Sequence, residues 1–115
     1  MMNTYEAAKA AREAGKPDIA ICFRGRNGHR DVTPSGWQVI RPGFKTDPDG
    51  AWYFQHNKTF SGGRADDAVL QQAKDWATSK YKLTGEWVKI PGFRGDWFPA
   101  ESVSAIKATQ KEAGK

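Results

Sequence analysis

The chain has 115 residues, with 18 Lys and Arg against 13 Asp and Glu, five Trp, two His and one Cys. This length predicts one compact domain over residues 1–115. A single Cys excludes a disulfide within the chain, and Cys22, His29 and His56 are too few for the usual structural zinc site. No apolar run approaches the roughly 20 residues that cross a bilayer, and the first residues lack the pattern of a signal peptide. We therefore expect a cytoplasmic protein that does not contact a membrane.

The N-terminal residues 3–14 predict a short helix that ends at a glycine. Asn3 can cap this helix, Glu6 follows three residues later as in a capping box, and alanines fill its turns. Gly15 offers the left-handed conformation that terminates helices. Residues 19–23 then alternate Ile, Ala, Ile, Cys and Phe, which is typical of a strand with a buried face.

The middle of the chain, residues 18–81, predicts a core made of a strand, a hairpin and a helix. The hairpin strands are expected at 37–41 and 51–56, and the Asp-Pro-Asp-Gly run at 47–50 favours a turn between them. A helix is expected from about residue 65 to residue 81. Its apolar residues recur with a period of 3.6 and should pack on the sheet: Val69, Ala73, Trp76, Ala77 and Tyr81.

The C-terminal residues 86–112 predict a strand, a loop and a last helix. The strand is expected at 85–90 and the loop at 91–96, and Pro99 suits the first position of the helix. The order of elements therefore favours the α+β class. We expect a small antiparallel sheet of three to four strands with helices packed on one face.

Positive charge is concentrated in residues 21–65, which hold seven Lys and Arg against three acids. Five of the seven are Arg, whose planar guanidinium suits phosphate groups. Aromatic residues are interleaved with them, and exposed rings can stack bases at roughly 1–3 kcal/mol each. These observations predict a binding face for nucleic acid or a protein partner: Arg24, Arg26, Arg30, Trp37, Arg41, Lys45, Tyr53 and Lys58. The alternative is a solvated basic surface over aromatics that belong to the core.

A second candidate for partner binding lies near the C-terminus. Trp and Arg are preferred anchors at interfaces, and two Trp and two Phe surround a basic, glycine-rich turn here. The candidate residues are Trp87, Phe93, Arg94 and Trp97. The alternative is a hairpin-like cover whose aromatic rings close one end of the core.

Residues that could carry catalysis are few. A nucleophilic pair would need Cys22 beside His29 or His56, but Cys22 alternates with apolar residues as a buried thiol would. We therefore expect neither an enzyme nor a bound metal or cofactor.

Two functional hypotheses remain open at this point. The first is a small nucleic-acid-binding or regulatory module that uses the basic, aromatic-rich face. The second is a protein-binding accessory or inhibitor of a phage or plasmid, whose partner is acidic or processes nucleic acid.

Overall fold

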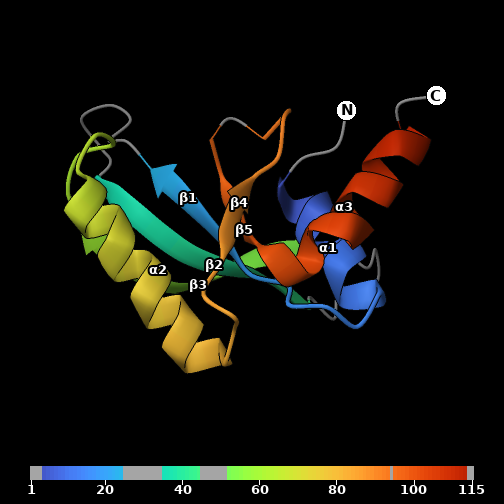
Figure 1. Ribbon diagram of the computed structural model, residues 1–115, viewed down its shortest axis with the longest axis horizontal. Coiled ribbons are helices and arrows are strands. Elements are labelled where there is room, and N and C mark those ends of the chain that lie inside the picture. Colours follow the sequence, from blue (N-terminus) through green and yellow to red (C-terminus); the bar gives the residue numbers. More distant parts are fainter. Residues whose placement is uncertain (1–3, 25–34, 45–51, 94, 114–115) are drawn as a thin grey trace.

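The computed structural model of the chain describes residues 4–24, 35–44, 52–93 and 95–113, with the backbone alone described for 42–44, 52–57 and 112–113. Within these residues it contains three helices and a five-stranded antiparallel sheet (Figure 1). This confirms the α+β class. The elements in chain order are α1 (Thr4–Glu13), β1 (Ala20–Arg24), β2 (Gly36–Phe44), β3 (Trp52–Ser61), α2 (Asp67–Tyr81), β4 (Trp87–Lys89), β5 (Trp97–Pro99) and α3 (Ala100–Ala113).

The strands lie in the order β3-β2-β1-β5-β4, and every neighbouring pair is antiparallel. The β2–β3 pair is the hairpin that the sequence predicts. Strand β5 was expected as loop and helix start, but Trp97 pairs with Ile21 of β1 and with Lys89 of β4. The sheet therefore has five strands where three to four were expected, and β5 joins the C-terminal hairpin to the rest.

The helices lie on both faces of the sheet, which corrects the expectation that they share one face. Successive side chains of a strand point to opposite faces. Ile21 accordingly packs in the cluster beneath α2, while Ala20 packs in the cluster beneath α1 and α3. Because β1 is apolar on both sides, it needs cover on both sides, and Figure 1 shows α2 separated by the sheet from the other two helices.

Helix α2 packs as its apolar spacing predicts. Leu70, Ala73 and Ala77 are buried against the sheet, and Val69, Trp76 and Tyr81 pack around them. The helix begins where the Asp66 side chain accepts a hydrogen bond from the backbone N–H of Val69 at 3.3 Å. It ends at Lys82, which adopts the left-handed conformation with φ 54°.

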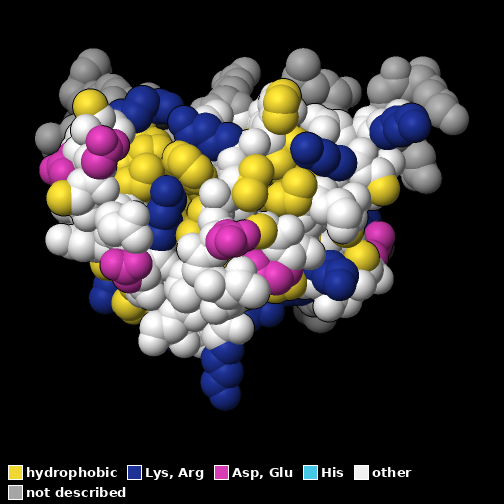
Figure 2. All heavy atoms as spheres, in the orientation of Figure 1, with side chains coloured by type: hydrophobic (Ala, Val, Ile, Leu, Met, Phe, Trp, Pro, Cys, Tyr) yellow, Lys and Arg dark blue, Asp and Glu magenta, His cyan; other side chains and the backbone are white. Residues whose placement is uncertain are grey.

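Helix α2 leaves much of its face of the sheet uncovered. It packs mainly on β2 and β3. A helix is about 10–12 Å wide with its side chains, and strands are about 4.8 Å apart, so one helix covers about two strands. Figure 2 shows the consequence, which is a hollow with exposed apolar side chains between α2 and the β4–β5 hairpin.

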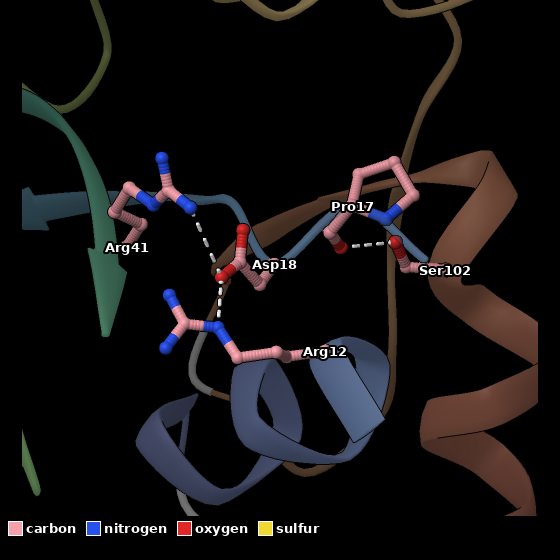
Figure 3. Close-up of polar contacts among 5 residues, drawn as sticks. All are labelled: Arg12, Pro17, Asp18, Arg41 and Ser102. Carbon is pink, nitrogen blue, oxygen red and sulfur yellow. Dashed lines mark hydrogen bonds and ion pairs between the residues drawn. The ribbon is translucent and has the colours of Figure 1, made fainter. Parts of the chain in front are cut away.

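A partly buried ion cluster joins α1 to the first two strands (Figure 3). Asp18, which is 8% exposed, accepts a hydrogen bond from Arg12 Nε at 2.6 Å and lies 3.5 Å from Arg41 Nη2. One residue earlier, the carbonyl of Pro17 accepts a hydrogen bond from Ser102 Oγ of α3. The segment that enters β1 is thus held by α1, β2 and α3 together.

We expect Asp18→Ala to lower the free energy of unfolding by about 2 kcal/mol, because two guanidinium groups lose a common, nearly buried acceptor. The measurement is urea denaturation at neutral pH. Glu13→Ala is the matched control, since Glu13 is exposed and lies 3.9 Å from Lys9. It should change stability by less than about 0.5 kcal/mol. An equal effect of the two substitutions would contradict the role given to Asp18.

Candidate functional site

The hollow beside α2 is lined by aromatic rings with basic side chains over them. Its floor is Phe23 of β1 and Trp97 of β5, both partly exposed. Arg64, which precedes α2, and Lys74 on α2 reach over it from one side, and Lys89 of β4 reaches over it from the other. We call these five residues the α2–β5 hollow.

The cations lie directly over the rings. Lys74 Nζ is 3.6 Å from the centroid of the Trp97 ring, and Lys89 Nζ is 4.9 Å from the same centroid. Arg64 Cζ is 4.8 Å from the centroid of Phe23. These distances are within the roughly 6 Å range of cation–π attraction. Three positive groups are thus gathered over two rings.

The start of β4 and the residues before β5 form the boundary of the hollow. Trp87 Nε1 donates a hydrogen bond to Thr78 Oγ1 of α2 at 3.2 Å, which fixes the start of β4 against the helix. Gly95, two residues before Trp97, has a φ of +84°, a conformation that favours glycine. A Cβ at this position would approach Arg64 Nη1 at 3.9 Å. This is an ordinary van der Waals distance, so the positive φ and not the space beside Arg64 is what favours glycine here.

Electrostatics in the hollow disfavours the positive charge of Lys74. Burial is the largest cause that lowers the pKa of Lys74 below its ordinary value, and the positive charge of Lys89 lowers it further. The carboxylate of Asp67 acts in the opposite direction. An anion bound between the two ammonium groups would therefore relieve a repulsion that is present in the unliganded protein.

The Trp97 indole contributes a further unsatisfied group. Its Nε1 is buried and has no hydrogen-bond partner in the described part of the chain. A buried donor without an acceptor is unfavourable by about 1–3 kcal/mol. The part of Trp97 that a ligand can reach is therefore its partly exposed ring, with positive charge over it.

A second group of cations and rings lies on the opposite flank of α2. Lys58 Nζ of β3 is 5.5 Å from the Trp76 centroid, and Lys80 Nζ is 5.3 Å from it. At 100° per residue, Trp76 and Lys80 project from the other side of α2 than Lys74. This flank resembles the hollow in composition, but Trp76 lies on the helix itself and not on an uncovered sheet surface. Lys58 and Lys80 therefore match Lys74 and Lys89 in charge but lie outside the hollow.

The residues predicted from the sequence for the first binding face are not all exposed or together. Trp37 is only 4% exposed and packs edge-on to Phe23, so the expectation that it stacks on a ligand is corrected. Arg41 is held by Asp18 and lies 5.9 Å from the Tyr81 ring. Arg24 is exposed at the end of β1, and Lys58 is exposed on the other flank. Arg26, Arg30, Lys45 and the Tyr53 side chain lie outside what the structure describes.

The second predicted group is divided between the two faces of the sheet. Trp97 lies in the hollow and Trp87 at its boundary, whereas Phe93 is 3% exposed and packs on Phe98 beneath α1 and α3. Phe93 therefore closes the core, as the alternative reading of this segment expected. Arg94 is not among the described residues.

Sequence reasoning missed Phe23, Arg64, Lys74 and Lys89 as members of one site. One signal was available, because Lys89 and Trp97 become neighbours once residues 97–99 are recognised as a strand. For Lys74, the only local signal is its place beside the apolar stripe of α2. Nothing in the sequence says which ring it reaches.

The described residues offer little else for chemistry. Burial, and then the charge of Asp96 and a hydrogen bond with it, raise the pKa of Cys22 well above its ordinary value, so its thiol is protonated at neutral pH. No group of three His, Cys, Asp or Glu side chains in the described ranges is arranged to hold a metal ion. Each described helix is too short or too polar to cross a membrane.

Comparison with known proteins gives no assignment. No protein family matches the chain, and neither the curated proteins nor the solved structures give a significant match.

We expect Lys89→Gln to raise the pKa of Lys74, because it removes a positive charge that lowers that pKa. Asp67→Asn should lower the pKa of Lys74 further, because it removes the carboxylate that favours the charged ammonium. The measurement is an NMR titration of the Lys74 side chain. Burial remains in both variants, so neither should restore the ordinary value. A shift of the two variants in the same direction would refute this arrangement of charges.

Proposed function

We propose that the protein is a non-enzymatic module that binds nucleic acid through the α2–β5 hollow. The observation that carries this proposal is the placement of two lysine ammonium groups, Lys74 and Lys89, over one partly exposed tryptophan ring. Nucleic acid offers both partners that this arrangement lacks. Its phosphates would lie between the ammonium groups, and its bases present apolar faces to the ring.

The charge pattern supports a phosphate partner more than a carboxylate on a protein surface. Three cations converge on the hollow from two sides, which matches a chain of evenly spaced negative charges. Arg64 adds a planar guanidinium that can contact a phosphate through two N–H groups. The carboxylate of Asp67 raises the pKa of Lys74, but burial and the charge of Lys89 lower it by more.

The other basic residues predicted from the sequence are not part of the hollow. Arg24 is exposed at the end of β1, but it follows Phe23 directly, so its side chain points to the face of the sheet opposite the hollow. Arg26 and Arg30 follow it in the sequence, and their part in binding stays a prediction. Arg41 contributes less, because its ion pair with Asp18 already uses its charge within the fold.

We expect single-stranded oligonucleotides to bind with a salt dependence that reports three phosphate contacts. At about 0.7 counterions per contact, affinity should fall about 15- to 20-fold between 50 and 200 mM salt. The double variant Lys74→Gln/Lys89→Gln should reduce this to a two- to threefold loss, because two contacts are removed. The measurement is fluorescence anisotropy with labelled DNA and RNA strands.

The matched control is Lys58→Gln/Lys80→Gln, which removes the same net charge from the other flank of α2. It should leave the salt dependence close to that of the unmodified protein. If the two double variants behave alike, binding depends on net charge and not on the hollow. If no nucleic acid binds at 50 mM salt, the proposal fails and the protein-partner hypothesis takes its place.

A further inference from the structure

Resting on the proposed function, we infer that the α2–β5 hollow selects single-stranded over duplex nucleic acid. Two successive bases would lie on the rings of Phe23 and Trp97, and Lys74, Lys89 and Arg64 would contact the phosphate between them and the phosphates on either side. The spacing of the two rings, the cations that now cover them and the walls of the hollow support this inference.

The spacing of the rings requires unstacked bases. Ile21 of β1 pairs with Trp97 of β5, and Phe23 lies two residues further along β1. Residues in this diagonal relation lie about 7–8 Å apart on one face of a sheet. Consecutive bases in a duplex are stacked with a rise of about 3.4 Å per strand. Bases that use both rings must therefore be separated from each other, as they can be only in a flexible single strand.

A duplex cannot offer its base faces to these rings. Each base in a duplex is covered above and below by its neighbours, so only its edges and the backbone phosphates are accessible. The rings of the hollow offer surfaces on which base faces can stack. They do not offer the hydrogen-bonding groups that recognise base edges. A duplex would thus contact the cations alone, while an unpaired strand would contact both cations and rings.

The cations over the rings mark the positions that bases would take. Lys74 lies 3.6 Å from the Trp97 centroid, and Arg64 lies 4.8 Å from that of Phe23. Cation–π attraction at partly exposed sites is weaker than base–aromatic stacking. The long, flexible side chains can therefore leave the ring to a base and move to the adjacent phosphate. In this exchange the ammonium or guanidinium group gains a contact with a phosphate, and a base stacks on the ring in its place.

The walls of the hollow guide such a strand along the sheet. Arg64 and Lys74 are on the α2 side, Lys89 is on the β4 side, and the hydrogen bond from Trp87 to Thr78 closes the approach between helix and hairpin. Ring stacking accepts every base because each has an apolar face. We therefore expect little dependence on the sequence of the bound strand.

The test compares a labelled 12-nucleotide strand without internal pairing with the same strand in a 12-base-pair duplex, by fluorescence anisotropy at 50 mM salt. We expect the single strand to bind at least tenfold more tightly. Trp97→Leu and Phe23→Leu should each weaken single-strand binding about 5- to 150-fold, the range that corresponds to the loss of one stacked base. Neither should change the weak duplex binding.

Two variants distinguish stacking from loss of the fold. Trp97→Phe keeps a ring and should retain most of the single-strand affinity, and Trp76→Leu on the other flank should leave it unchanged. Equal binding of strand and duplex, or wild-type affinity in Trp97→Leu, overturns the inference while the proposed function stands. The absence of binding to both probes overturns the proposed function as well.

Discussion

The organisation of this molecule depends on a mismatch between the width of one helix and the width of a five-stranded sheet. Helix α2 covers about two strands, whereas α1 and α3 together cover the opposite face. The strands β1, β5 and β4 nevertheless carry large aromatic residues toward α2. Phe23 and Trp97 are thus pinned by the sheet but left only partly covered, and this incomplete cover creates the candidate site.

The basic side chains give these rings partial cover without closing the surface. Lys and Arg stems can lie along apolar surface while their charged ends stay near water. Lys74 and Lys89 do so over Trp97 at the expense of mutual repulsion, which contributes to the lowered pKa of Lys74. The same side chains that shield the rings in the unliganded protein are those that a polyanion would attract. Packing and binding are therefore linked through one set of contacts.

The parts of the structure set by local pattern could be predicted, and those set by tertiary pairing could not. The apolar stripe of α2 and the antiparallel pairing of β2 with β3 were expected from local sequence pattern, while the turn predicted at 47–50 lies outside the described residues. Strand β5 could not be predicted in this way. Its three residues are too few to show the alternation of a strand, and the residues that they pair with are distant in sequence. The candidate site could not be predicted for the same reason, because its residues come together only through tertiary packing. A basic region at 21–65 was visible, but Arg41 is engaged by Asp18, and Lys74 and Lys89 lie outside that region.

We expect nucleic acid to bind in the hollow, with Trp97 in direct contact. The five tryptophan indole N–H groups give separate reporters in a two-dimensional ¹H–¹⁵N NMR spectrum. On titration with an unlabelled 12-nucleotide strand, we expect the Trp97 signal to shift most, because its partly exposed ring lies in the hollow beneath Lys74 and Lys89. The signals of Trp37 and Trp76 should change little. Shifts concentrated on Trp76, with the Trp97 signal unmoved, would show that nucleic acid does not bind in the hollow.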